Sequence, residues 1–177
     1  WSYDKSIAWK GPADLSGTIR FLWDDQYLYV GAEVTDDVFL NNRQDGELWQ
    51  GDGLQFLVDP CRAMSESVGK YDYGMAVGKK GPQAWCFLSA DSGAPVGEAK
   101  DIIVSSKRKG DNSGSMTYVV AIPWSRLAPF KPAAGANLGL TMLLNEDDGP
   151  CRKSYMMWFG KASTKQVESV GDLILGQ

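Results

Sequence analysis

The side chains in this sequence that could carry out chemistry are carboxylates, and they gather in three clusters, Asp24-Asp25, Asp36-Asp37 and Glu146-Asp147-Asp148. Two carboxylates that flank a glycosidic bond are sufficient to hydrolyse it. Each cluster, however, lies where a run of apolar residues ends, and short Asp side chains favour turns because they hydrogen-bond their own backbone. A turn-forming role is the simpler interpretation, and we predict that the chain is not an enzyme.

Histidine is absent from the sequence. It is the usual general base near neutral pH and the commonest zinc ligand, so its absence excludes Ser-His-Asp and Cys-His catalysis and the usual zinc hydrolase sites. The three cysteines, Cys61, Cys86 and Cys151, show no C-x-x-C metal spacing. They allow one disulfide, such as Cys61–Cys151, with one free thiol, or three thiols.

Aromatic side chains offer a different chemistry, the binding of sugars. A pyranose presents an apolar face that packs on an aromatic ring, and its hydroxyls pair with Asn, Gln, Arg and carboxylates. Among the seven Trp, Trp23, Trp124 and Trp158 lie in apolar contexts that predict core packing, whereas Trp85 fits either the core or a surface. Trp49 lies in the polar run D-G-E-L-W-Q-G-D, and we predict that it contacts a ligand.

A sheet has to position these side chains. Short apolar runs with β-branched and aromatic residues alternate with turn signals, which predicts an all-β fold, an antiparallel β-sandwich of jelly-roll type with about ten strands. The expected strands are Thr18–Trp23, Tyr27–Thr35, Gly53–Val58, Tyr71–Val77, Ala84–Leu88, Ile102–Ser106, Met116–Ile122, Leu138–Asn145, Tyr155–Phe159 and Asp172–Leu175.

Between the strands, one helical turn is expected from Pro123 to Leu127, with almost no other helix. The segments Phe39–Gly51 and Gly160–Val170 are expected to be irregular. In a sandwich such loops gather at the ends or along one face, where ligands usually bind.

Composition limits the class of protein. The 177 residues, with a net charge of −4, predict a single domain over residues 1–177 with no nucleic-acid partner. No apolar run is long enough to span a bilayer. The chain opens on Trp1-Ser2-Tyr3 without a signal peptide, which predicts that it is excised from a larger multidomain protein.

Five motifs in order resemble carbohydrate-binding module family 9. They are L-W-D-D-Q-Y-L-Y-V-G-A-E-V-T-D-D from Leu22, L-W-Q-G-D-G-L-Q-F-L-V-D from Leu48, I-P-W-S-R-L from Ile122, N-E-D-D-G-P-C-R-K-S-Y-M-M-W from Asn145, and G-D-L-I-L from Gly171. The resemblance implies a β-sandwich that binds sugar without catalysis. It also implies a secreted protein whose covalently linked polysaccharide-degrading enzyme is targeted to a plant or microbial glycan.

The resemblance also implies which residues touch the sugar. The family grips its ligand between two Trp side chains, and Trp49 corresponds to the first. The second belongs to the loop that corresponds to Phe159–Val170, which has no Trp here, so that Phe159 or Trp85 would have to replace it.

Polar contacts are carried over in the same way. An acidic position of the family becomes Gln55, which still hydrogen-bonds a hydroxyl, and a polar position becomes Met142, which makes that face more apolar. Arg152 corresponds to an Arg that reaches the sugar. The predicted sugar contacts are Trp49, Gln55, Tyr73, Trp85, Asn145 and Arg152.

Some members of the family hold structural calcium, and this chain has suitable carboxylates. Loop carboxylates and backbone carbonyls can together form the oxygen-rich site that calcium prefers. The predicted ligands are Asp36, Asp37, Asp147 and Asp148, and no other cofactor is expected.

Two other functions stay open. Related sandwich domains in electron-transfer subunits bind a b-type haem through Met and Lys, and this chain has Met142, Met156-Met157, Lys161 and Lys165 in suitable segments. Such a domain would show a Soret band. The other alternative is a structural spacer without a ligand, in which no glycan would change the Trp fluorescence.

Overall fold

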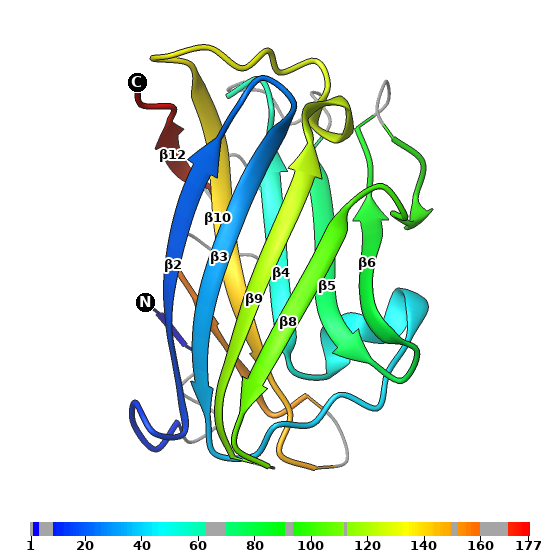
Figure 1. Cartoon of the computed structure of the whole chain (residues 1–177), viewed down its shortest axis with the longest axis vertical. Helices are drawn as coiled ribbons and strands as arrows, with labels where there is room; N and C mark the ends of the chain where they lie inside the picture. Colours follow the sequence, from blue (N-terminus) through cyan, green and yellow to red (C-terminus); the bar gives the residue numbers. More distant parts are fainter. Residues whose placement is uncertain are drawn as a thin grey trace.

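Two antiparallel sheets pack face to face in this protein (Figure 1). The computed structural model describes residues 2–3, 9–62, 70–90, 94–111, 113–149, 152–159 and 170–177. Twelve strands occur in these residues, and the predicted all-β sandwich is confirmed. None of the helices in the described part of the chain has the length and apolar character needed to cross a membrane.

The larger sheet has the order β1-β11-β10-β4-β5-β6-β7, and β12 pairs with the other end of β10. The smaller sheet has the order β2-β3-β9-β8. The strands of the larger sheet are β1 (Ser2–Tyr3), β4 (Gly53–Asp59), β5 (Tyr71–Gly78), β6 (Gly81–Leu88), β7 (Gly97–Glu98), β10 (Asn137–Glu146), β11 (Ser154–Met157) and β12 (Gly171–Ile174). Those of the smaller sheet are β2 (Leu15–Trp23), β3 (Tyr27–Asp36), β8 (Ile103–Lys109) and β9 (Gly114–Pro123).

The hairpin of β2 and β3 shows how the sequence determines these strands. In β3 every second residue from Leu28 to Val34 is buried, as expected for a strand with one face on the core. The turn before β3 is held by Asp24, whose Oδ1 accepts hydrogen bonds from the backbone N–H groups of Gln26 and Tyr27, both at 2.8 Å. The aspartate therefore forms a turn, as the sequence predicts.

The core lies between the inner faces of the two sheets. Tyr71 and Tyr73 on β5 are fully buried there, and their hydroxyls donate to the carbonyls of Ala128 (2.7 Å) and Arg126 (2.8 Å). These bonds hold η2 (Trp124–Leu127) and the residues after it against the end of the sandwich. Phenol groups of this kind bury a large apolar ring while their polar atom finds a partner.

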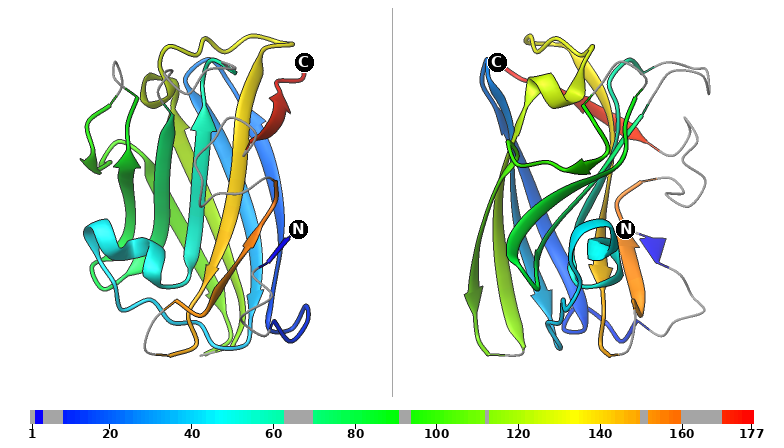
Figure 2. Two further views of the ribbon diagram at one scale, coloured as in Figure 1. Left: turned by 180° about the vertical axis from the view of Figure 1, so that it is seen from behind. Right: turned by 90° about the vertical axis from the view of Figure 1, so that its right-hand side faces the viewer.

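The outer face of the larger sheet is partly covered. Leu57, Leu143 and Met157 point away from the core cluster and are nevertheless buried. The short 3-10 helix η1 (Asp45–Gln50) lies against this face, as both views of Figure 2 show. Beside η1 this outer face carries polar side chains of the sheet, of which Gln55 is half-buried and Asp72 and Asn145 are each 3% exposed.

Strand β8 is one of the two edge strands of the smaller sheet, and β2 is the other. Its residues alternate between exposed and half-buried along the whole strand, and Lys107 and Lys109 point into solvent. At one edge of the larger sheet, β7 has only two residues.

The predicted elements agree with the structure except at a few points. All ten expected strands are present, and the expected helical turn after Pro123 is η2. The two-residue strands β1 and β7 were not predicted. Helix η1 contradicts the expectation of an irregular Phe39–Gly51 segment with almost no helix. The sequence did not indicate it, because a 3-10 helix of six residues is too short to show a periodic apolar pattern.

Strand β10 provides a test of the core. Leu140 is fully buried on β10, whereas Ile174 on the neighbouring β12 is 64% exposed. We expect Leu140→Ala to lower the free energy of unfolding by about 2–5 kcal/mol because it leaves a cavity, and Ile174→Ala to lower it by less than about 1 kcal/mol. Denaturant unfolding of the two variants measures the difference, and equal losses would contradict the assignment of β10 to the core.

Candidate functional site

Two aromatic rings and one guanidinium group form a stack beside η1. Trp49 is near the end of η1, and its side chain remains 38% exposed. The guanidinium carbon of Arg152 lies 5.5 Å from the centroid of the Trp49 ring and 4.4 Å from that of Tyr155 on β11. Cation–π contacts at these distances hold all three groups in place, and they join η1 to the beginning of β11.

Three polar side chains on adjacent strands form a connected row next to this stack. Gln55 on β4 donates from Nε2 to Oδ1 of Asp72 on β5 at 2.9 Å, and Asn145 on β10 donates from Nδ2 to Oε1 of Gln55 at 3.4 Å. The register of the strands explains the row. Gln55 is opposite Leu143 on β10, and Asn145, two residues further on, points to the same face and is opposite Tyr155 on β11. The side-chain amide of Gln55 is therefore fixed in orientation between Asp72 and Asn145.

Three polar atoms of this region have no hydrogen-bond partner, as is also the case for atoms of several residues elsewhere in the described chain. Within the described part of the chain, Nε and Nη2 of Arg152 and Oδ1 of Asn145 are buried and have no hydrogen-bond partner. Burial lowers the pKa of Arg152 to about 10, although Tyr155 and Asp72 act in the opposite direction. The guanidinium is therefore charged at neutral pH, and its Nε and Nη2 donors have no acceptor in the described residues.

Trp85 belongs to the same face but lies on the far side of Gly74. Gly74 is opposite both Gln55 and Trp85 in the register. A Cβ atom at Gly46 of η1 would be only 3.6 Å from Nε1 of Trp85. Trp85 therefore packs against η1, half-buried, and supports the helix that carries Trp49.

An acidic group lies at the end of the sandwich where β10 finishes. The carboxylates of Asp14, Asp37, Glu146 and Asp148 all come within 4.8 Å of one another. Nζ of Lys153 donates to three of them, at 2.8 Å to Asp14, 2.9 Å to Glu146 and 2.6 Å to Asp148. Desolvation alone would lower the pKa of Lys153, but these bonds raise it above its usual value. The lysine thus neutralises part of the group.

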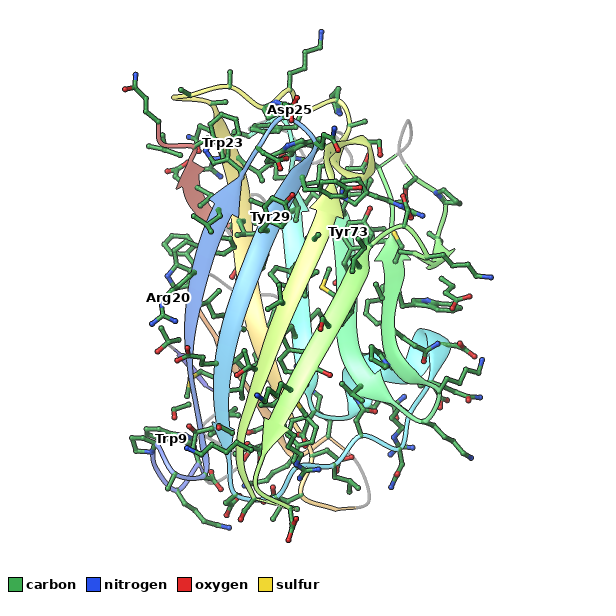
Figure 3. The ribbon with its side chains drawn as sticks, in the orientation of Figure 1. Trp9, Arg20, Trp23, Asp25, Tyr29 and Tyr73 are labelled. Carbon is green, nitrogen blue, oxygen red and sulfur yellow. The ribbon has the colours of Figure 1, made fainter. Side chains whose placement is uncertain are left out.

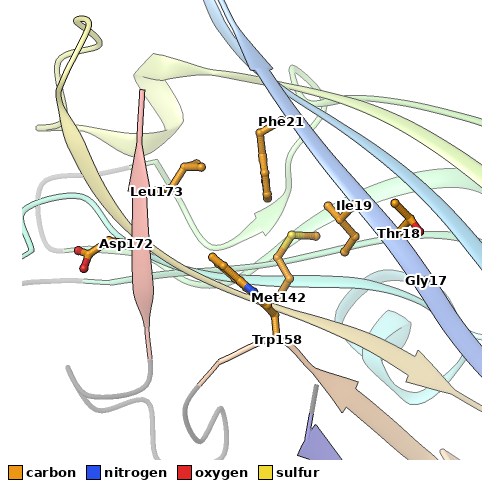
Figure 4. A pocket seen from close by; sticks show the side chains of 8 residues that line it. All are labelled: Gly17, Thr18, Ile19, Phe21, Met142, Trp158, Asp172 and Leu173. Atoms are coloured by element: carbon orange, nitrogen blue, oxygen red, sulfur yellow. The ribbon is translucent and has the colours of Figure 1, made fainter. Parts of the chain in front are cut away.

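A cavity of about 500 Å³ opens on the flank between β2 and β12 (Figure 4). Ile19, Phe21, Met142, Trp158 and Leu173 give it an apolar lining. It lies on the other side of β10 from the amide row, because Met142 faces the core and Asn145 faces outward.

A sequence model of the family described as carbohydrate family 9 binding domain-like matches residues 2–176. The chain belongs to this family. No curated protein matches it.

Solved structures of similar fold include two of a carbohydrate-binding module family 9 from Caldicellulosiruptor kristjanssonii. The complex with cellotriose has a TM-score of 0.67 and 20% identity, covering 97% of this chain and 83% of that one. The complex with glucose has a TM-score of 0.64 and 19% identity, covering 97% and 86%. A putative carbohydrate-binding protein from Bacteroides uniformis ATCC 8492 has a TM-score of 0.63 and 13% identity, covering 96% and 83%. At these identities the structures show a shared fold.

The structure brings four of the predicted sugar contacts of this family 9 domain together, namely Trp49, Gln55, Asn145 and Arg152. Tyr73 contradicts its prediction. It is fully buried between the sheets, and its hydroxyl is used by the Arg126 carbonyl (Figure 3). Side chains alternate across a strand, so that Asp72, next to it, occupies the outer face instead.

Two further side chains, Met142 and Trp158, do not lie where they were expected. Met142 was expected on the sugar-binding face but is 1% exposed in the core. Trp158 was expected in the core but is 40% exposed beside the flank cavity, and Phe159, a candidate second ring, is 48% exposed. Of the residues named for haem, Met142 and Met156 are buried in the core, and Lys161 and Lys165 lie outside the described residues, as does Cys151.

The predicted calcium ligands divide into two pairs. Asp37 and Asp148 belong to the acidic group around Lys153, whereas Asp36 and Asp147 do not. Oδ1 of Asp36 and of Asp147 accept the backbone N–H groups of Val38 and Gly149, each at 2.9 Å, as turn residues do. Burial, with nearby carboxylates, raises the pKa of Asp36 to about 7.

Several residues of the site were missed from the sequence. Asp72 could have been found from its place between the buried Tyr71 and Tyr73, because alternation directs it outward. Tyr155 is close to Arg152 in sequence, which is a weak signal. Asp14 carries no such signal, because its partner Lys153 lies far along the chain.

The charge cluster allows a stability prediction. Lys153→Met leaves Asp14 and Glu146, which are 2% and 0% exposed, without their counter-charge, and we expect a loss of about 3–5 kcal/mol in unfolding free energy. Lys80→Met is the control, since the ion pair of Lys80 with Asp45 is half-exposed and contributes about 1 kcal/mol or less. Thermal and denaturant unfolding compare the two; similar losses would show that the cluster contributes no more than a surface pair.

Proposed function

We propose that this carbohydrate-binding domain holds a glycan on the outer face of the larger sheet, between η1 and β11. The observation that supports this most strongly is the stack of Trp49, Arg152 and Tyr155 beside the amide row of Gln55 and Asn145. Aromatic area and planar polar groups are thus adjacent, as sugar recognition requires.

The unpaired polar atoms match the needs of a hydroxyl-rich ligand. A sugar hydroxyl both donates and accepts a hydrogen bond. Arg152 keeps free donors and Asn145 keeps a free acceptor. Buried polar atoms without partners are rare in native proteins and call for an explanation, and a bound sugar that supplies both kinds of partner is one.

The ligand class follows from the charges and from the relatives. Asp72 lies near Arg152 and offsets its positive charge, which favours a neutral sugar over an acidic one. The relatives from Caldicellulosiruptor kristjanssonii bind cellotriose and glucose, so we propose glucose-containing chains of plant or microbial glycans as ligand. In the parent protein the domain, itself non-catalytic, would direct a secreted, covalently attached polysaccharide-degrading enzyme to its substrate.

For calcium, the acidic group does not fit an ion as it stands. Calcium prefers six to eight oxygen ligands, but the ammonium group of Lys153 is bound by three of the four carboxylates at 2.6–2.9 Å. We propose that Lys153 takes the place of a structural ion here and that no cofactor is required.

Removal of Trp49 tests the sugar site. Trp49→Ala is expected to weaken binding of cellotriose about tenfold or more, because Trp side chains at the centre of an interface contribute most of its affinity, while the melting temperature changes little. Wild-type affinity is expected to be on the order of micromolar to millimolar. Isothermal titration calorimetry with cellotriose and a glycan array measure the effect.

Trp158→Ala is the matched control, because Trp158 is 40% exposed, much like Trp49, but lies beside the flank cavity. It is expected to bind as wild type does. If Trp158→Ala loses binding and Trp49→Ala keeps it, the glycan binds at the flank and the proposed site is wrong.

Chelation tests the role of Lys153. We expect EDTA to leave the melting temperature of the wild type unchanged, and added calcium to stabilise Lys153→Met by occupying the vacated carboxylates. A fall in the wild-type melting temperature after EDTA, restored by calcium and not by magnesium, would show that an ion is bound beside Lys153.

A further inference from the structure

Asp52 is a buried carboxyl that bonds two separate segments of backbone. It directly precedes β4 and is 1% exposed. Its Oδ1 accepts the N–H of Asp147 at 2.7 Å, and its Oδ2 accepts the N–H of Leu40. The backbone of Asp52 adds two more links to the same region, since its N–H donates to the Leu40 carbonyl (3.0 Å) and its carbonyl accepts Nδ2 of Asn41 (2.8 Å).

The first of these segments leads to Trp49. Nδ2 of Asn41 also approaches the carbonyl of Leu48 in η1 at 3.3 Å. A Cβ atom at Gly51 would overlap the Asn41 side chain, so the turn that closes η1 is packed tightly on Asn41. The position of Leu40 and Asn41 therefore determines where η1 and its Trp49 lie.

The second segment leads to Arg152. Asp147 follows Glu146, the last residue of β10. Lys153 is bonded to the same end of the strand, because its N–H donates to the Glu146 carbonyl at 2.7 Å. Asp147 and Lys153 are thus both held at the end of β10, Asp147 by Asp52 and Lys153 by Glu146. Arg152 is the neighbour of Lys153 and lies against Trp49.

We propose that Asp52 is a positioning residue for sugar binding, because its carboxyl group joins the segment that leads to Trp49 to the segment that leads to Arg152. This inference rests on the proposed function of the site. Asp52 touches no ligand. Its effect is to hold Trp49 and Arg152 in their positions relative to each other.

A carboxyl group fills this role because each of its two oxygens has a lone pair that accepts a hydrogen bond, whether or not the group is protonated. An amide at the same position keeps one acceptor and replaces the other with a donor, so that one of the two backbone N–H groups loses its partner. A buried N–H without a partner is unfavourable, and the segment that carries it is expected to move. Asp52→Asn therefore breaks one link while it preserves the size of the side chain.

Asp36 offers a matched control. It is likewise a buried carboxyl, 2% exposed, and burial raises its pKa to about 7 and that of Asp52 to about 9. Its side chain bonds only the nearby N–H of Val38, and its Oδ2 has no partner in the described part of the chain. Asp36→Asn thus makes the same replacement at a second buried carboxyl of this region without breaking a bond to Leu40 or Asp147.

The experiment measures the affinity of both variants for cellotriose by calorimetry, below their melting temperatures. Asp52→Asn is expected to weaken binding at least tenfold, and Asp36→Asn by less than twofold. If Asp52→Asn does not fold, Asn41→Ala removes the neighbouring link, from Asn41 Nδ2 to the backbone carbonyls of Asp52 and Leu48, and is expected to weaken binding in the same way. Wild-type affinity in Asp52→Asn, or equal losses in the two Asp variants, would overturn the proposal.

Amide hydrogen exchange separates this inference from the proposed function. If the wild type binds neither cellotriose nor any glycan on an array, the proposed function fails. The positioning role is then read from the exchange of the Leu40 and Asp147 amides, which is expected to be faster in Asp52→Asn and unchanged in Asp36→Asn. Unchanged exchange at both amides in Asp52→Asn would overturn the positioning role by itself.

Discussion

The burial of β10 is the constraint on which the rest of the structure depends. From Leu138 to Glu146 every residue of this strand is buried, and it pairs with β4, β11 and β12. Its inner side chains form part of the core, whereas Asn145 on its outer face belongs to the amide row and Glu146 at its end binds Lys153. Stability and recognition therefore share one strand, and the site inherits the rigidity of the core.

Charged groups near the site serve mainly to hold the protein's own segments together. Lys153 joins Asp14 to the end of β10, and Asp52 joins the turn after β10 to the segment before η1. The candidate ligand surface consists of rings, amides and one arginine whose charge is offset by Asp72. Such a surface suits a neutral, hydroxylated molecule, because the hydroxyls need directional partners more than they need net charge.

Much of the fold could be predicted from the sequence, because alternation of apolar residues and Asp-rich turns are local signals. The exposure of Trp49 could be predicted in the same way, from its polar surroundings. Tyr73 and Met142 were assigned to the wrong face, since a shift of one residue moves a side chain to the other side of a sheet. The contact of Lys153 with Asp14 and that of Asp52 with Leu40 and Asp147 depend on how distant segments pack, and no local pattern indicates them.

The edges of the two sheets affect how this domain behaves among other copies of itself. An uncovered edge strand can pair with the edge of another molecule and start aggregation. Here β8 presents Lys107 and Lys109 to solvent, and β7 is only two residues long. The lysines place positive charge where another β8 would approach, and a two-residue edge offers little backbone to pair with. At these two edges, strand-to-strand association between copies of the domain is therefore disfavoured.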